Sequence, residues 1–329
     1  MTTAKVWSVK RPYNGEPTLD DFVLTEEVLP PLKEGEILIE ALYLSLDPYY
    51  RLFPVQDGLP GEQVARIIES KAPGFEKDDL VCAHAGWRSQ SVINVNRPLR
   101  FGIKVEKIEE VTGLSPSLWI GAIGMPGVTA YMSFMERCDP KEGEVIVVSA
   151  ASGAVGSVVG QLAKLKGLKV VGLVGSEEKC RYIKEIGFDQ AINYKEENIS
   201  AALDSIAPNG VDIFFDSVGG YISDIMYGKL RDKGRVLLCG QISAYNQPQP
   251  KVTNWSMTIV RKELEVKGFY IFSPVNVPEF PRVRQALIPL FQQGKLKAKE
   301  HVTKGFENMP KAFIELFSGS NFGKAVVKA

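Results

Sequence analysis

The stretch VIVVSAASGAVGSVVG, residues 145–160, decides the fold of this chain. Its first four residues are β-branched without polar alternation, as in a parallel strand that is buried on both faces. After Gly153 the apolar spacing becomes helical. A strand, a glycine turn and a helix in this order can hold a dinucleotide pyrophosphate on free N–H groups at the positive end of the helix. Gly153 and Gly156 would let the backbone approach phosphate, and Gly160 would let the helix approach the strand.

The residues after this helix indicate which dinucleotide is bound. A second buried strand, residues 168–174, is followed by Gly175-Ser176-Glu177-Glu178-Lys179 and not by the acid that reads an NAD ribose. Ser176 and Lys179 leave room and positive charge for a 2′-phosphate, although Glu177 and Glu178 also suit the first turn of a helix. The sequence therefore favours NADPH over NADH.

Length and composition limit the classes of function. A chain of 329 residues exceeds the usual size of one core, so we expect two domains. The 39 basic and 39 acidic residues balance, which makes nucleic acid a poor partner. No apolar run is long enough to cross a membrane, and the first residues pass into a strand pattern without a signal segment. We expect a cytoplasmic protein.

The cysteines do not form a metal-site pattern. Cys82, Cys138, Cys180 and Cys239 are widely spaced, and His84 and His301 are the chain's two histidines. We therefore expect inert thiols, structural histidines and no bound metal.

The order of predicted elements gives the fold class, α/β. Up to about residue 120 the chain shows short strands and turns, which predict a β-rich domain. Strands and helices then alternate, with further strands at 190–193, 211–215, 235–239 and 264–270. Six strands with helical crossovers predict a doubly wound parallel sheet of the Rossmann type. Helices near 282–293 and 309–317 and a strand at 324–328 complete the chain.

Six segments of the chain, in order, resemble one family, the zinc-free medium-chain dehydrogenases/reductases of the leukotriene B4 12-hydroxydehydrogenase or prostaglandin reductase branch. They are Leu46-Asp47-Pro48-Tyr49, residues 124–131, the Gly153 turn, residues 215–220, residues 239–246 and residues 305–310. The resemblance implies a GroES-like domain at 1–122, an NADP-binding Rossmann domain at 123–292, and a C-terminal segment, 293–329, that returns to the first domain. It also implies a homodimer formed through the sixth strand.

The resemblance implies reduction by NADPH of the conjugated C=C bond of 15-oxoprostaglandins and other enones and enals. Some relatives also oxidise the 12-hydroxyl of leukotriene B4 with NADP+. The negative charge that develops on the carbonyl oxygen requires a fixed hydrogen-bond donor. By resemblance the donors are the Tyr245 hydroxyl and the nicotinamide ribose, and the α-carbon takes its proton from Tyr245 or water. Without the resemblance, Tyr245 would be interpreted as a loop tyrosine that packs its ring.

The resemblance also assigns binding residues. Gly153, Ala154, Val155, Gly156 and Ser157 hold the pyrophosphate, and Lys179 and Tyr194 face the 2′-phosphate. The nicotinamide end is assigned to Ser217, Cys239, Gly240, Gln241, Ile242, Ser243, Tyr245, Phe269, Tyr270, Ile271 and Asn321. Tyr49, Met125 and Arg261 are assigned to substrate. Tyr194, Phe269, Ile271 and Asn321 each have an alternative as core, interface or loop residues.

Two positions depart from the family pattern. Relatives usually have Asn where this chain has Ser217, so a cofactor contact there would be shorter or mediated by water. Relatives also tend to show a proline-rich loop and a Tyr before the Glu-Leu of the sixth strand, whereas this chain has Gln247-Pro248-Gln249-Pro250 and Arg261-Lys262-Glu263-Leu264. Arg261 could pair with a fatty-acid carboxylate or be a solvated charge. The alternative functions are a zinc-free NADPH quinone reductase and a non-catalytic NADPH-binding protein.

Overall fold

The computed structural model describes residues 2–53, 58–109, 111–251 and 253–329, and all the predicted site residues are among them. The chain packs as two compact units. Unit 1 comprises Met1–Met125, Phe272–Glu279 and Glu300–Ala329, and unit 2 comprises Pro126–Ile271 and Phe280–Lys299. These units are defined by packing, so the roles and boundaries assigned to the two domains stay predictions.

Unit 2 contains the predicted six-stranded parallel sheet. The strands lie in the order β10-β9-β8-β11-β12-β13, and every neighbouring pair is parallel. Their bounds are β8 (Val145–Val148), β9 (Lys169–Val174), β10 (Gln190–Asn193), β11 (Val211–Asp216), β12 (Leu230–Leu238) and β13 (Glu265–Gly268). The strand order reverses between β8 and β11, and ligands bind at such a switch point in open α/β sheets.

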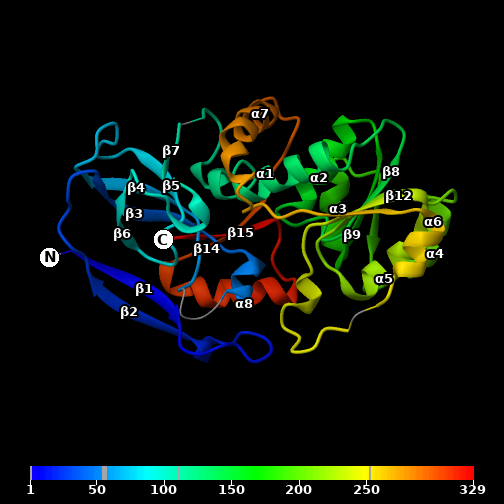
Figure 1. The fold of residues 1–329 in the computed structure, drawn as a ribbon, viewed down its shortest axis with the longest axis horizontal. Helices are drawn as coiled ribbons and strands as arrows, with labels where there is room; N and C mark the ends of the chain where they lie inside the picture. The colour runs from blue at the N-terminus through cyan, green and yellow to red at the C-terminus, as the bar shows by residue number, and fades with distance from the viewer. Residues whose placement is uncertain (1, 54–57, 110, 252) are drawn as a thin grey trace. The chain divides into compact units, whose positions relative to one another are not determined.

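Helices cover both faces of this sheet, as the apolar runs of β8 and β9 require. Val171 and Leu173 of β9 pack into a core with Ile199 of α4 and Ile222 of α5. Gly172 between them faces the opposite way, toward Ile183 of α3. Figure 1 shows α2 and α3 on one side of the strands and α4, α5 and α6 on the other. The helices are α2 (Gly156–Leu165), α3 (Glu177–Glu185), α4 (Ile199–Ile206), α5 (Gly220–Lys229), α6 (Ser256–Lys262) and α7 (Phe280–Gln292).

The sixth strand is shorter than the sequence predicted. β13 ends at Gly268, although the Phe269 N–H still donates to the Leu238 carbonyl at 3.0 Å. Tyr270 is 61% exposed and Ile271 is buried. The chain therefore leaves the sheet at Phe269, the first of the three residues after β13 that are predicted to contact the nicotinamide.

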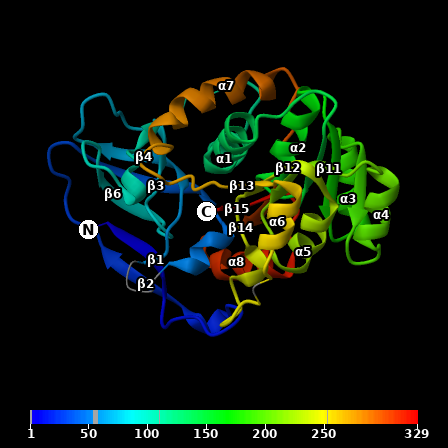
Figure 2. The same cartoon turned by 45° about the vertical axis from the view of Figure 1, so that its right-hand side comes forward.

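Unit 1 is β-rich, which confirms the prediction for this part of the chain. A seven-stranded sheet contains β3 (Glu36–Ser45), β4 (Gln63–Ser70), β5 (Leu80–Ala83), β6 (Gln90–Asn94), β7 (Glu106–Lys107), β14 (Glu300–Lys304) and β15 (Lys324–Lys328). The hairpin of β1 (Thr3–Val9) and β2 (Phe22–Val28) is a separate ribbon beside this sheet (Figure 2). Its Trp7 N–H donates to the Trp87 carbonyl at 3.0 Å.

Helical segments complete unit 1. α8 (Met309–Ser318) packs its Met309 and Phe313 side chains against Leu44 and Trp87. α1 (Met125–Tyr131) begins at Met125, the last residue of the first segment of unit 1, and its remaining residues belong to unit 2. It continues as a π-helical turn, Met132–Arg137. None of the helices in the described ranges combines the length and apolar character that a membrane span requires.

Candidate functional site

The glycine turn after β8 has a backbone that larger residues would not fit. Ala150 adopts a left-handed conformation, with φ of 47°. A Cβ on Gly156 would lie 2.5 Å from the Ala150 carbonyl oxygen, and a Cβ on Gly153 would lie 3.1 Å from it. The N–H groups of Ser157, Val158 and Val159, in the first turn of α2, donate to the Gly153 and Val155 carbonyls at 3.0–3.1 Å, so an anion would be met by the backbone of residues 154–156 before them. The turn therefore offers a tight anion cradle.

Gly160 was predicted to let the helix approach the strand, and the structure shows which side chain needs the space. A Cβ at Gly160 would lie 1.9 Å from Cζ of Phe188, which follows α3 in the chain. Gly160 is therefore required because of the Phe188 ring, and not because of the strand backbone.

The ends of β9 and β10 bring Lys179 and Tyr194 to one place. Asn193 pairs with Val174, so Gly175 and Tyr194 leave the sheet side by side. The Ser176 hydroxyl caps α3 by accepting from the Lys179 N–H at 3.3 Å. Burial lowers the pKa of Lys179, and the positive charge of Lys195 lowers it further. Lys195, which directly follows Tyr194 in the chain, was not predicted as a site residue.

The turn after β11 is organised by the buried carboxylate of Asp216. It accepts from the N–H groups of Val218, at 2.9 Å, and Gly219, at 3.0 Å. The Ser217 hydroxyl is buried beside the Cys239 thiol, and no other hydrogen-bond partner within the described residues reaches its oxygen. Ser217 therefore has hydrogen-bonding capacity to spare where the chain departs from the family.

Tyr245 folds back onto the end of β12. The short helical turn Ile242–Ala244 reverses the chain, and the Tyr245 hydroxyl accepts from the Gln241 N–H at 3.4 Å. A Cβ on Gly240 would lie 3.3 Å from the same oxygen. Burial raises the pKa of Tyr245, while the Gln241 N–H lowers it, and the net result is a raised pKa. This places a protonated phenol among the predicted nicotinamide residues.

The predicted substrate residues belong to both units. In unit 1, the Tyr49 ring packs against Tyr50 at 4.7 Å and Phe272 at 5.4 Å between centroids, and Met125 is buried. Arg261 belongs to unit 2, where it is exposed in the last turn of α6. Asn321, predicted to contact the cofactor, is in unit 1 and donates to the Gly323 carbonyl at 3.2 Å.

Unit 1 also contains two buried pairs, each of a basic side chain and a carboxylate, that were not predicted from the sequence. The Lys324 ammonium lies 2.7 Å from the Asp47 carboxylate, which also accepts from the Tyr50 hydroxyl at 3.1 Å. His84 Nε2 lies 3.4 Å from a carboxylate oxygen of Glu62. No spacing in the sequence connects the first pair, because Asp47 and Lys324 are 277 positions apart.

None of the cysteines, all within the described residues, is in a disulfide, and the Cys82 thiol lies 3.3 Å from a Glu62 carboxylate oxygen. Burial raises the pKa of Cys138 and of Cys239 to about 12, so both thiols stay protonated. Within the described residues there is no group of three or more His, Cys, Asp or Glu side chains placed to hold a metal ion.

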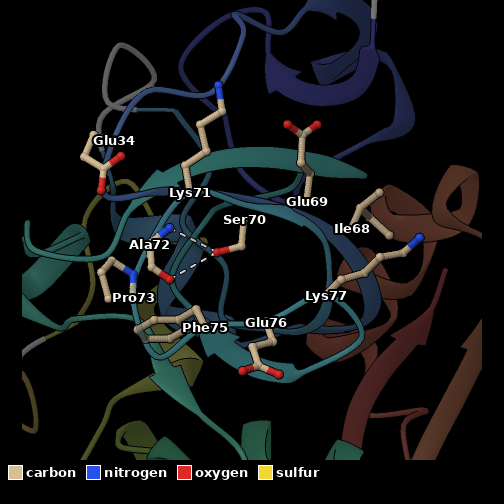
Figure 3. Close-up of a pocket in the computed structure, with 10 residues that line it drawn as sticks. All are labelled: Glu34, Ile68, Glu69, Ser70, Lys71, Ala72, Pro73, Phe75, Glu76 and Lys77. Atoms are coloured by element: carbon tan, nitrogen blue, oxygen red, sulfur yellow. Dashed lines mark hydrogen bonds between the residues drawn. The ribbon is translucent and has the colours of Figure 1, made fainter.

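An open pocket on unit 1 contains none of the predicted site residues (Figure 3). Ser70 turns back on Ala72, accepting from its N–H at 3.1 Å and donating to its carbonyl at 3.2 Å. These polar atoms close a loop, and we assign the pocket no part in the function. Its lining is Glu34, Ile68, Glu69, Ser70, Lys71, Ala72, Pro73, Phe75, Glu76 and Lys77.

Comparison with known proteins gives matches along the whole chain. Residues 154–291 match a family model described as zinc-binding dehydrogenase, and residues 5–99 match one described as the N-terminal domain of oxidoreductase. The chain is 45% identical to prostaglandin reductase 1 of Bos taurus, covering 100% of both proteins. It is 39% identical to the NADP(+)-dependent 2-alkenal reductase of Nicotiana tabacum, over 92% of this chain and 90% of that protein. The crystal structure of CurA from Vibrio vulnificus in complex with NADPH superimposes with a TM-score of 0.90 at 34% identity, covering 99% of both chains.

Proposed function

Since this chain belongs to the medium-chain dehydrogenase/reductase family, in the zinc-free branch of the prostaglandin reductases, we propose that it reduces conjugated C=C bonds with NADPH. Its substrates are α,β-unsaturated ketones and aldehydes, including 15-oxoprostaglandins. The names of the relatives, prostaglandin reductase and 2-alkenal reductase, support both substrate classes.

The turn after β8 and the ends of β9 and β10 fit NADPH. The backbone space that a Cβ on Gly156 would fill suits a pyrophosphate held by residues 153–157. Lys179 and Tyr194 hold the 2′-phosphate. When bound, NADPH supplies the hydride. The nicotinamide end is held by Ser217, Cys239, Gly240, Gln241, Ile242, Ser243, Phe269, Tyr270, Ile271 and Asn321.

The position of the Tyr245 hydroxyl, against the backbone of Gly240 and Gln241, is the observation that carries the proposal. Hydride adds to the carbon β to the carbonyl, and negative charge develops on the carbonyl oxygen. Tyr245 donates a hydrogen bond to that oxygen, and its raised pKa keeps it protonated at neutral pH. The α-carbon then takes a proton from Tyr245 or water.

The two domains have different roles in this proposal. Residues 123–292, with Asn321, bind the cofactor, and residues 1–122 and 293–329, with Met125 and Arg261, bind the enone. Tyr49 and Met125 contact the hydrocarbon part of the substrate, which suits their apolar surroundings. We assign Arg261 to a fatty-acid carboxylate of the substrate. Its exposure is equally compatible with a charge that contacts only solvent.

A homodimer formed through β13 belongs to the same proposal. β13 is an edge strand of its sheet, so one side of its backbone can pair with a second copy. Val266 on this strand and Val260 on α6 are exposed apolar residues, 37% and 66% accessible, that a partner would cover.

We place the protein in the cytoplasm. None of the four cysteines, all within the described residues, is in a disulfide, as expected in a reducing compartment.

Following NADPH absorbance with a 15-oxoprostaglandin, a short 2-alkenal and a quinone tests the proposal. We expect both enone classes to be reduced to saturated carbonyl products, and NADH to be a poorer donor. Quinone turnover without enone turnover would instead identify a quinone reductase. Tight NADPH binding with no oxidation by any enone would identify a binding protein without this activity.

A further inference from the structure

The ends of β9 and β10 place a second lysine at the predicted 2′-phosphate site. A Cβ on Gly175 would lie 2.8 Å from the Tyr194 hydroxyl oxygen and 3.2 Å from Cε of Lys195. The Tyr194 N–H donates to the Val174 carbonyl at 3.0 Å, so the register of the two strands fixes this approach. The end of the Lys195 side chain therefore lies at the glycine turn that leads into α3.

The backbone that carries Lys195 is held in place by several hydrogen bonds. The Asn193 carbonyl accepts from the N–H groups of Glu196, at 3.0 Å, and Glu197, at 2.8 Å. The Lys195 N–H donates to the Asn193 side chain at 3.3 Å, and the Tyr221 hydroxyl donates to the Tyr194 carbonyl at 3.3 Å. This turn is therefore organised before any ligand binds, which lowers the entropic cost of using it.

The acids near this turn leave the charge of Lys195 available. The Glu197 carboxylate accepts from the Asn193 N–H at 2.7 Å and is thereby committed to the backbone. Across the described ranges, no carboxylate forms an ion pair with Lys195.

The two lysines repel each other in the absence of an anion. Lys195 is close enough to lower the pKa of half-buried Lys179, which burial also lowers. The opposing effect of Glu178 is smaller. An anion with two negative charges would relieve this repulsion and gain attraction to both ammonium groups. A 2′-phosphate is such an anion.

We propose that Lys195 is the second cation of the 2′-phosphate site and that it determines, together with Lys179, the preference for NADPH over NADH. This inference rests on the proposed function, because it concerns the cofactor named there. Lys179 at the start of α3 and Lys195 after β10 approach the phosphate from two neighbouring strand ends, and the Tyr194 hydroxyl adds a hydrogen bond.

Calorimetric titration with 2′,5′-ADP and with 5′-AMP tests the role of Lys195 without any turnover. The two ligands differ by the 2′-phosphate, so their affinity ratio reports on this site alone. Losing one charge-assisted contact should weaken 2′,5′-ADP binding to Lys195→Ala roughly tenfold and leave 5′-AMP binding unchanged. Lys195→Arg should retain most of the ratio. Lys184→Ala, an exposed lysine in the last turn of α3, is the matched control and should bind as the parent does.

The outcomes separate this inference from the proposed function. A parent protein that binds both ligands equally would contradict the NADPH assignment itself. A parent that prefers 2′,5′-ADP, with the same preference in Lys195→Ala, would overturn only the role of Lys195. An equal loss of both ligands in Lys195→Ala would assign Lys195 to the structure of the turn and overturn its role in specificity.

Discussion

The acids next to the predicted site residues are held differently in the two units. In unit 2, Asp216 binds the N–H groups of Val218 and Gly219 at 2.9 and 3.0 Å. In unit 1, Asp47 faces the Lys324 ammonium at 2.7 Å. Unit 2 thus uses a buried carboxylate to shape the backbone at a strand end, whereas unit 1 buries a carboxylate against a side chain from the far end of the chain.

The two carboxylates therefore depend on partners at different distances along the sequence. The N–H partners of Asp216, two and three residues away, persist as long as the turn does, and the same carboxylate also accepts from the Ser149 hydroxyl at 3.1 Å. A buried ion pair depends on two remote segments, and removing one member leaves an uncompensated charge. We therefore expect the Asp47 pair in unit 1 to be more sensitive to loss of its partner side chain than the Asp216 turn in unit 2, whose carboxylate is bound by backbone N–H groups.

The largest expected effect is on the stability of unit 1. Lys324→Met should lower the free energy of unfolding by about 3–5 kcal/mol, because Asp47 then stays buried without its cation. Urea unfolding measures this change. Lys328→Met, at the exposed end of the same strand, is the control and should change stability by less than about 0.5 kcal/mol. Similar losses in both variants would refute the importance of the buried Asp47–Lys324 pair for the stability of unit 1.

A smaller loss is expected from overpacking in unit 2. Gly160→Ala should cost about 1–3 kcal/mol, because the new Cβ would collide with the ring of Phe188. Phe188→Ala in the same chain should recover part of the loss introduced by Gly160→Ala, as a double-mutant cycle in unfolding experiments would show. Additive effects of the two substitutions would contradict the assigned contact.

The smallest expected effects are opposite pH dependences in the two units. Burial raises the pKa of Glu144 in unit 2, but Arg235, the Lys141 N–H and Arg231 outweigh it and leave the pKa lowered. Its stabilising contribution is present above the unfolded pKa and is lost as pH falls through the folded one. Burial raises the pKa of Glu300 in unit 1 against the weaker effects of Ser117 and Lys324. Its contribution is present at low pH and is lost as pH rises through the folded pKa.

Unfolding at about pH 4 and about pH 7 distinguishes these two carboxyl groups. Relative to the parent, Glu144→Gln should be more destabilised at the higher pH, and Glu300→Gln should gain stability there. Shifts of the same sign in both variants would contradict the comparison.

The sequence predicted what depends on local pattern. The strand runs and the Gly153 turn predicted the parallel sheet of unit 2. The role of Tyr245 came only from the resemblance of residues 239–246 to a family, and the contact of its hydroxyl with the Gln241 N–H was not predicted. The pair of Asp47 and Lys324 could not be predicted, because its members meet only through the pairing of β15 with β3. Lys195 was missed for a similar reason, since only the register of β10 against β9 places it near Gly175.

The central claim is that Tyr245 stabilises the developing charge on an enone carbonyl during reduction by NADPH. The most direct test is kcat/KM for a short 2-alkenal with Tyr245→Phe, alongside NADPH affinity measured separately by fluorescence. We expect a loss of ~10²-fold or more in kcat/KM with NADPH affinity retained. Reduction of the alkenal by Tyr245→Phe at the parent rate would contradict it.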